Sequence, residues 1–271
     1  MRVSDPARLF RRNCPCVRRL VGLTNFQDLL TVEVRPLVNA AIIGASGGIG
    51  GALASRLEQS GDYARVLRFS RRPGVDSESI DILDEASIMA AAAAAESAVD
   101  RLDLILVATG RLQDACWSAL PEKSWRALDA GALQAMFAVN TIGPALVAKH
   151  FLPLLRRGTR GVFAALSARV GSIEDNHLGG WYGYRASKAA LNMMVRTLAI
   201  ELSRRNPDAV CVALHPGTVD TPLSAPFQRG VRPEKLFAPE TAAEHLLRVI
   251  AELSPADSGK LLAWDGSAVP F

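Results

Sequence analysis

From residue 38 onward the chain alternates short apolar segments with amphipathic helical patterns, and this alternation limits the fold more than any other feature. A strand–helix–strand repeat implies a parallel sheet with helices on both faces. Nothing in residues 37–271 looks like a linker, so we expect one doubly wound α/β domain, with ligands at the carboxyl ends of its strands. The predicted strands are 38–43, 64–69, 102–108, 161–166, 209–214 and 260–263, and the predicted helices follow residue 48, cover 86–99 and 130–155, follow residue 184, and cover 239–253.

A glycine-rich loop separates the first predicted strand from the first helix. Its glycines permit a tight turn and let a pyrophosphate approach the backbone, while the helix N-terminus supplies N–H donors. Because a strand precedes the loop and a helix follows it, the pattern predicts a Rossmann domain that binds a dinucleotide. The positions assigned to the phosphates are Gly44, Ser46, Gly48, Ile49 and Gly50.

A basic turn, Ser70-Arg71-Arg72, follows the second predicted strand. Dinucleotide folds often place an acid there to hold the ribose hydroxyls, whereas guanidinium groups suit a 2′-phosphate. The turn therefore favours NADP(H) over NAD(H); the alternative is a solvated basic turn. Asp81-Ile82 is placed to meet the adenine ring.

Tyr184 and Lys188 stand four residues apart at the start of a helical pattern. Positions i and i+4 share one helix face, so the two head groups can converge. A free tyrosine has a pKa near ~10, and a nearby cation favours the phenolate and lowers that pKa. The pair is therefore a candidate general acid/base. Taken alone, the same spacing also fits an exposed helix pair.

Asn140 lies inside an otherwise apolar helical stretch that continues to Pro144. Proline has no N–H, so residue 144 cannot donate to the carbonyl of residue 140, and the helix is expected to kink there. A free carbonyl of this kind can hold a water molecule and extend a proton relay. A core asparagine bonded to neighbouring backbone explains the pattern equally well.

Together these motifs resemble the short-chain dehydrogenase/reductase family over residues 38–271, in order and in spacing, with Pro216-Gly217 as a further match. The segments 167–173, 184–188, 214–217 and 264–266 are similar to its C-factor/sniffer-like branch. The resemblance implies that Tyr184 exchanges a proton with the substrate oxygen and that Lys188 lowers its pKa and binds the nicotinamide ribose. It implies that Asn140 supports a water relay.

The resemblance also implies further cofactor contacts and a reaction. Hydride would move reversibly between NADP(H) and a small carbonyl or alcohol substrate. The cofactor-binding positions on the later strands would be Ala108, Thr109, Gly110, Pro216, Gly217, Val219 and Thr221, besides Tyr184 and Lys188.

One departure from the family concerns the serine that orients the substrate oxygen. Family members commonly read Ser-Ser-x-x-Gly with the second serine catalytic, but counting back from Gly171 puts Ala168 in that slot. Ser167 is the best remaining candidate for the catalytic serine. A one-residue step along a strand reverses the side-chain direction, so without a bulge Ser167 points away from the site.

The charge of the chain is concentrated at its start. Residues 1–36 contain seven arginines and three acids, which accounts for the whole net charge of +4. The pI therefore gives no support for a nucleic-acid-binding body. The segment 1–36 reads as a disordered extension, an organelle-targeting peptide, or a basic arm for membrane or nucleic acid.

Composition limits the remaining partners. Four cysteines, at 14, 16, 116 and 211, form no disulfide or zinc pattern, which predicts a cytoplasmic protein without a metal site. No apolar run reaches the ~18 residues of a membrane span. Family habit implies a homo-oligomer.

Two functions of different classes remain in competition. The first is an NADP(H)-dependent carbonyl reductase or alcohol dehydrogenase, and the second is a low-turnover cofactor-binding protein of the C-factor type that signals or senses redox state. The segment 222–239 is expected to cover the pocket. Its Arg229, Arg232 and Lys235 lean towards anionic substrates, although a solvated loop would carry the same residues.

Overall fold

The computed structural model describes residues 38–74, 76–112 and 121–271. The predicted N-terminal extension, and the cysteines at 14, 16 and 116, lie outside the described residues. The chain separates into one unit that ends at Pro36 and a second unit, Leu37–Phe271, which carries every element discussed below.

An eight-stranded sheet forms the centre of the second unit, in the order β10-β9-β6-β5-β4-β1-β2-β3. The predicted α/β doubly wound fold is confirmed, with one correction: β10 pairs antiparallel with β9, while the other pairings in this sheet are parallel. The strands are β1 (Val38–Ile43), β2 (Tyr63–Ser70), β3 (Glu78–Ser79), β4 (Leu104–Val107), β5 (Val162–Leu166), β6 (Val210–His215), β9 (Leu261–Ala263) and β10 (Ala268–Val269).

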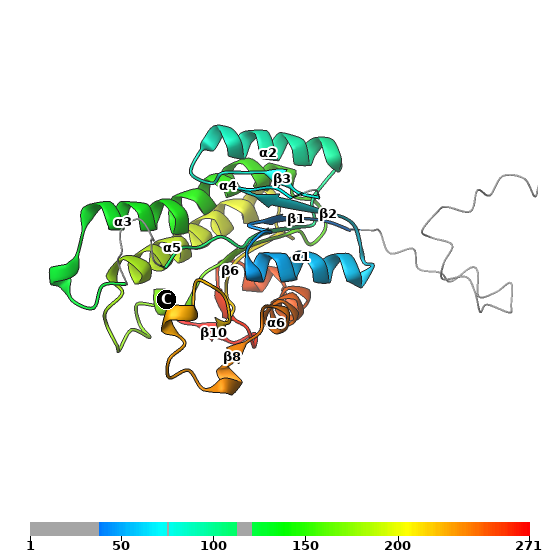
Figure 1. The fold of residues 1–271 in the computed structure, drawn as a ribbon. Coiled ribbons are helices and arrows are strands. Elements are labelled where there is room, and N and C mark those ends of the chain that lie inside the picture. Colours follow the sequence, from blue (N-terminus) through cyan, green and yellow to red (C-terminus); the bar gives the residue numbers. More distant parts are fainter. Residues whose placement is uncertain (1–37, 75, 113–120) are drawn as a thin grey trace, which may run out of the picture. The chain divides into compact units, whose positions relative to one another are not determined.

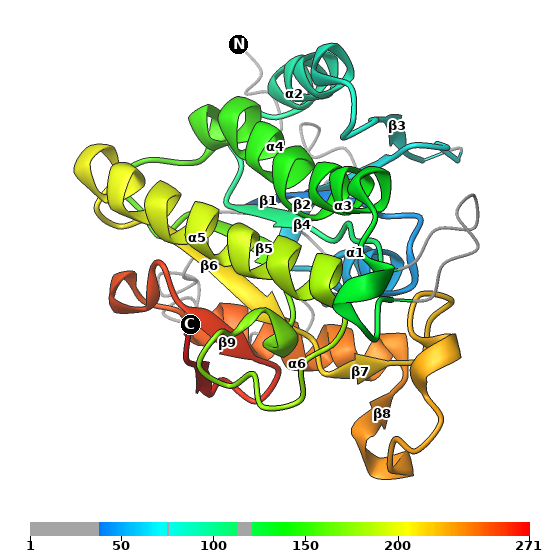
Figure 2. The same cartoon turned by 90° about the vertical axis from the view of Figure 1, so that its left-hand side faces the viewer.

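Helices cover both faces of this sheet, as Figure 1 shows. The face covered by α2, α4 and α5 encloses one apolar core, and the face covered by α1 and α6 encloses the other. Figure 2 looks onto α3 and α4, which follow each other end to end, and onto α5, which lies beside them over the sheet. The helices are α1 (Gly48–Ser60), α2 (Glu85–Ala98), α3 (Ala130–Phe137), α4 (Gly143–Phe151), α5 (Tyr182–Arg205) and α6 (Pro239–Glu252).

Local chemistry accounts for several of these boundaries. α1 ends at Ser60, and Gly61 caps it in the left-handed conformation at φ 73°, which favours glycine. The side chain of Asp84 accepts a hydrogen bond from Ala86 N–H and so caps the start of α2. Pro239 opens α6, where its missing N–H has no helical partner to lose.

The predicted kink at Asn140 is a π-helical turn, Ala138–Ile142, between α3 and α4. Gly143 N–H donates to the carbonyl of Ala138, five residues back, and Pro144 follows at the start of α4. The wider turn accommodates a residue that cannot donate, and π-turns of this kind are frequent at functional sites.

The stretch from α3 to Leu154 is, by length and composition alone, apolar enough to cross a membrane. One such helix is weak evidence, because core helices of soluble proteins pass the same test. Here Val147, Ala148 and Phe151 on α4 pack into the core between the helices and the sheet.

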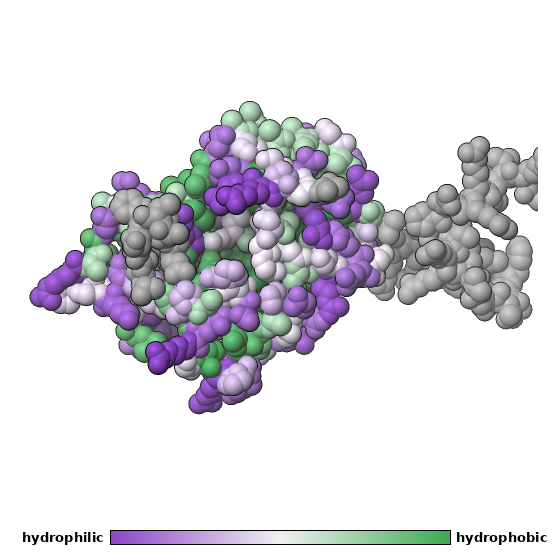
Figure 3. All heavy atoms as spheres, viewed as in Figure 1, coloured by the Kyte–Doolittle hydropathy of each residue, from purple (hydrophilic) through white to green (hydrophobic). Residues whose placement is uncertain are grey.

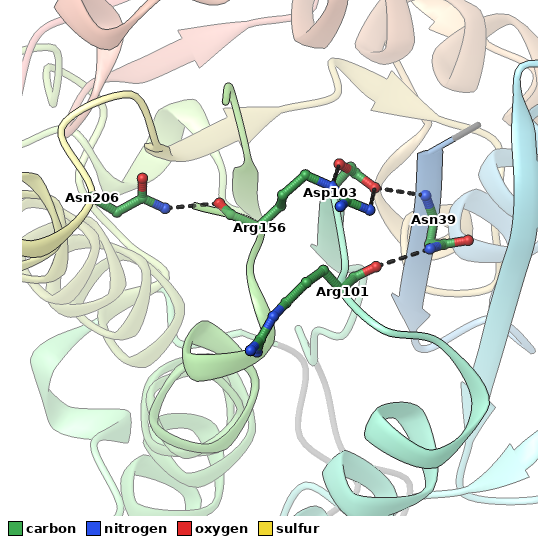
Figure 4. Close-up of polar contacts among 5 residues, drawn as sticks. All are labelled: Asn39, Arg101, Asp103, Arg156 and Asn206. Atoms are coloured by element: carbon green, nitrogen blue, oxygen red, sulfur yellow. Dashed lines mark hydrogen bonds and ion pairs between the residues drawn. The ribbon is translucent and has the colours of Figure 1, made fainter. Parts of the chain in front are cut away.

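A polar network joins four segments at the end of the sheet away from the glycine loop (Figure 4). Asp103 accepts hydrogen bonds from Asn39 N–H at 2.9 Å and from Arg156 Nε at 2.6 Å. Asn206 Nδ2 donates to the carbonyl of Arg156, and Asn39 Nδ2 donates to the carbonyl of Arg101, both at 2.9 Å. The network therefore fixes the start of β1 and the chain before β4. It lies at the opposite end of the strands from their carboxyl ends, where ligands are expected.

Candidate active site

The glycine loop lies at the carboxyl end of β1 and packs against the end of β4. Gly44 has φ 92°, and a side-chain carbon there would lie 2.9 Å from the carbonyl oxygen of Ala108. The N–H groups of Gly44 and Ala45 both donate to the carbonyl of Phe69 on β2. Only glycine fits this conformation and this close approach, as the sequence predicted for a phosphate loop.

Two cavities lie on either side of the loop and share the residues 46–47 and 108–110. The β2-side cavity measures about 330 Å³ and the Tyr184-side cavity about 360 Å³. Thr109 Oγ1, between them, is buried and has no hydrogen-bond partner within the described residues. Two adjoining cavities with an unpaired buried hydroxyl in their shared wall fit an extended polar ligand such as a dinucleotide.

Most of the predicted cofactor residues line these cavities. The β2-side cavity is lined by Gly44, Ser46, Arg71, Asp81, Ile82, Ala108, Thr109 and Gly110. The Tyr184-side cavity is lined by Ser46, Gly48, Ile49, Ala108, Thr109, Gly110, Tyr184, Lys188, Pro216 and Thr221. Arg72 lies beside Ser70 in a neighbouring depression. Gly50, Gly217 and Val219 line neither cavity, and Gly217 packs against the ring of Phe237 instead.

Tyr184 and Lys188 lie on the buried face of α5, 8% and 3% exposed, at the wall of the Tyr184-side cavity. Lys188 Nζ donates to the carbonyl of Leu166 at 2.8 Å and lies 5.9 Å from the centre of the Tyr184 ring. The predicted convergence of the two head groups therefore exists in the structure.

Burial sets the acid–base properties of this pair. Removal from water raises the pKa of Tyr184 to about 12 and lowers the pKa of Lys188 to about 7. The direction of the Tyr184 pKa shift is opposite to the one we expected from a neighbouring cation, because burial disfavours the charged phenolate. A proton on Lys188 would favour the phenolate of Tyr184, as an opposite charge nearby does.

Asn140 is fully buried and its side chain holds three groups together. Its Oδ1 accepts from Arg111 N–H, and its Nδ2 donates to Arg111 O and to Ser187 Oγ, at 2.8 to 3.0 Å. Ser187 Oγ in turn donates to the carbonyl of Tyr184 at 2.9 Å. The side chain thus links the loop after β4 to the helical turn that carries Tyr184, and a relay through the Asn140 carbonyl stays a prediction.

Ser167 and Ala168 point in different directions at the end of β5. Ser167 Oγ donates to Asn192 Oδ1 at 2.6 Å, within the contact between β5 and α5. Ala168 packs in a buried cluster with Tyr184. The residue beside the tyrosine is therefore a methyl group, and the hydroxyl of Ser167 is bonded elsewhere. Ser167 nevertheless lines the Tyr184-side cavity together with Tyr184 and Lys188, so its catalytic role stays a prediction.

The two aromatic residues before Tyr184 differ in placement. Trp181 packs on the apolar cluster around Tyr184, whereas Tyr182 is 37% exposed and lies outside that cluster. Positions 182 and 184 are separated by ~200° around a helix, which explains the difference.

Other contributors were missed from the sequence. Ser187 and Asn192 are polar residues on the buried face of α5, and their spacing from Tyr184 and Lys188 could have revealed them. Glu122 accepts two hydrogen bonds at the start of α5: its carbonyl accepts from Trp181 N–H, and its carboxylate accepts from Gly183 N–H. No local pattern marks a partner so far away in sequence.

Among the described residues no group of histidine, cysteine and carboxylate side chains could hold a metal ion. The fold and the site together define a dinucleotide-binding oxidoreductase of the Rossmann class. A family model described as "short chain dehydrogenase" matches residues 38–231. The chain belongs to the short-chain dehydrogenase/reductase family, whose members are generally NAD(P)-dependent oxidoreductases.

Relatives of known name agree with this assignment. C-signal of Myxococcus xanthus is 37% identical over 155 residues, which are 57% of this chain and 85% of that protein. The 1-hydroxy-2-glutathionyl-2-methyl-3-butene dehydrogenase of Rhodococcus sp. is 31% identical over 83% of this chain and 96% of its own length.

Solved structures show the same fold. The NADPH-bound carbonyl reductase from chicken fatty liver superposes with a TM-score of 0.75 at 25% identity, over 87% of this chain and 94% of that one. The carbonyl reductase Sniffer of D. melanogaster also has a TM-score of 0.75, at 21% identity, over 87% of this chain and all of its own. The predicted resemblance to the C-factor/sniffer-like branch is confirmed by these matches.

Proposed function

We propose that the protein is an NADP(H)-dependent carbonyl reductase or alcohol dehydrogenase. The observation that carries the proposal is the placement of Tyr184 and Lys188 in the wall of a cavity that the glycine loop also lines. Proton donor, cation and phosphate loop thus face one volume, as a reaction between a bound nicotinamide and a carbonyl requires.

The chain's own residues perform the proton chemistry. The bound cofactor would supply the hydride that adds to the carbonyl carbon. As the π electrons of the carbonyl move to its oxygen, that oxygen takes the proton of the Tyr184 hydroxyl. The products are the alcohol and a phenolate. A protonated Lys188 stabilises that phenolate, and solvent returns the proton. A lysine whose pKa lies at about 7 is suited to this exchange near neutral pH.

The decisive test is Tyr184→Phe, assayed by absorbance of the reduced nicotinamide with a panel of aldehydes, ketones and quinones. We expect kcat to fall by about 10²–10⁴-fold, the contribution of a positioned acid/base. NADPH binding, measured by its fluorescence, should be retained. Equal turnover in the wild type and the variant would refute the assignment.

The preference for NADP(H) is supported by the basic turn after β2. Arg71 and Arg72 are exposed, and neither forms an ion pair with a described residue. Arg71→Ala with Arg72→Ala should raise the KM for NADPH about tenfold or more and leave that for NADH unchanged. Arg65→Ala, at an exposed arginine on β2 itself, is the matched control. Equal effects on both cofactors would contradict the preference.

A low-turnover signalling or redox-sensing protein is the second candidate, favoured by the methyl group of Ala168 beside Tyr184. The Ala168→Ser change decides between them. If the wild type binds NADPH but reduces carbonyls slowly, and the serine raises kcat about 10²-fold as an added oxyanion donor can, the second candidate is correct. If the wild type already reduces carbonyls rapidly, the low-turnover candidate is excluded.

We also propose self-association through the outer face of α5. Met193 is 66% exposed and Ile200 46% exposed there, an apolar face that a second copy would cover. Light scattering should give more than one chain per particle, and Met193→Glu should reduce that number. A monomeric wild type would contradict the proposal.

A cytoplasmic location completes the proposal. It is supported by the free thiol of Cys211, which is buried in the core and unpaired within the described residues. Fractionation of the expressing cell tests it, and recovery with membranes would contradict it.

A further inference from the structure

An apolar cluster borders Tyr184 on the side of the 222–239 segment. Its buried members are Leu112, Met136, Ala168 and Tyr184 itself, and its half-buried members are Val170, Trp181, Leu223 and Phe227. Apart from the tyrosine hydroxyl and the indole N–H, these side chains carry no polar group. Leu223 also lines the Tyr184-side cavity, so the cluster borders the reacting volume directly.

Trp181 is held in this cluster by an unusual backbone. Its φ is 53°, and within the described chain it is the one residue other than glycine with a positive φ. Trp181 N–H donates to the carbonyl of Glu122, and its own carbonyl accepts from Arg185 N–H at 2.8 Å. A strained conformation that neighbours maintain is typical of functional positions. Here the result is an indole directed at Tyr184, with ring centroids 6.3 Å apart.

The partner of Trp181 comes from the segment over the pocket. This segment runs from β7 (Thr218–Val219) to β8 (Leu236–Phe237), which pair as a separate parallel ribbon. Phe227 packs edge-to-face on Trp181, with centroids 5.0 Å apart and planes at 63°. The two rings therefore form an aromatic wall between the segment and the start of α5.

Four charged side chains among the described residues of the segment and of the chain after Ala168 are directed away from the wall. Arg229 and Arg232 are exposed, and the outer tip of the segment is hydrophilic in Figure 3. Lys235 Nζ lies 5.6 Å from the Trp264 ring, in a different aromatic cluster. Arg169, which follows Ala168, pairs with Asp175 at 2.6 Å. An anionic substrate at the wall would lose water without gaining these partners.

We propose, resting on the reductase function above, that Trp181, Leu223 and Phe227 form the substrate-binding wall and select uncharged, apolar aldehydes and ketones that bear a ring. The ring of the substrate lies against the aromatic pair, and its carbonyl oxygen reaches the Tyr184 hydroxyl. Under this proposal Arg229, Arg232 and Lys235 do not contact the substrate, so the preference for anionic substrates that we expected from them does not apply.

The test compares two aldehydes of nearly equal size, para-formylbenzoate and its methyl ester. The wall predicts a kcat/KM for the uncharged ester at least about tenfold above that for the carboxylate, a typical discrimination by an apolar pocket. Phe227→Ala and Leu223→Ala should each lower kcat/KM for the ester several-fold and leave the KM for NADPH unchanged. Leu178→Ala, at a residue 91% exposed, and Arg232→Ala are controls that should change neither value.

A binding measurement separates this proposal from the reductase function. Calorimetry with the alcohol product of the ester and NADPH reports on the wall without turnover, because this pair cannot react. A preference for the ester supports the wall. If neither aldehyde is reduced but the alcohol binds and Phe227→Ala weakens that binding, the wall is still supported and only the reductase function is refuted. A preference for the carboxylate substrate overturns the wall and leaves the reductase function intact, and loss of that preference in Arg232→Ala would assign it to Arg232. Neither turnover nor binding overturns both.

Discussion

Lys188 makes the sharpest prediction, because its charge state in the free protein can be measured through stability. The ammonium is 3% exposed, and burial lowers its pKa from 10.5 to about 7. Between those values the unfolded chain binds a proton that the folded chain does not. The free energy of unfolding therefore rises with pH in this window, by about 1.4 kcal/mol per pH unit from this group.

Replacing Lys188 with methionine removes the titrating amine and keeps a side chain of similar length. From the two pKa values, the destabilisation that Lys188 causes shrinks by about 2 kcal/mol between pH 7 and pH 9. Urea unfolding without cofactor, at one protein concentration, should show the wild type gaining on Lys188→Met by that amount. Because the pKa of Tyr184 is raised to about 12, its own contribution, a loss of stability with pH, begins only above about pH 10.

The control for this experiment is Lys123→Met, which changes an exposed lysine. Its unfolding free energy should run parallel to that of the wild type across the same pH range. Parallel curves for Lys188→Met as well would show that Lys188 keeps an ordinary pKa when folded, and the argument for a neutral, proton-exchanging lysine would fail.

Three further substitutions test the parts that position the site. Glu122→Ala removes the carboxylate that accepts from Gly183 N–H at 3.3 Å and should cost about 1 kcal/mol in urea unfolding, the value of a helix cap; Glu122→Gln, which keeps an acceptor oxygen, should cost less. Gly217→Ala places a carbon 2.7 Å from the Phe237 ring at φ 80°, so a loss of about 1–2 kcal/mol is expected, and an unchanged Tm would contradict it. Asp103→Ala leaves a guanidinium and a backbone N–H without their acceptor, for about 1–3 kcal/mol, and a neutral effect on unfolding would show that water replaces the carboxylate freely.

The sequence was sufficient for features that depend on local chemistry. The glycine loop is recognisable because the positive φ of Gly44 and its close approach to Ala108 exclude other residues. The main strands are recognisable because burial on both sides makes them continuously apolar, as in β4. The spacing of Tyr184 and Lys188 follows from helix geometry alone.

Features that depend on distant partners escaped prediction. The capping of α5 by Glu122 joins residues that are 61 positions apart. The short antiparallel β10 has too few residues for a periodic pattern. The direction of the Tyr184 pKa depends on how completely the fold buries both members of the pair, which spacing cannot reveal.

The π-helical turn at Ala138–Ile142 has a consequence for changes in chain length. Such a turn contains one residue more than an α-helix needs. Deleting one residue there would restore the α-helical turn with α3 and α4 nearly in phase, but the ring of Pro144 would then meet the carbonyl four residues before it. The length of this stretch therefore constrains divergence alongside its buried polar residues Asn140 and Thr141.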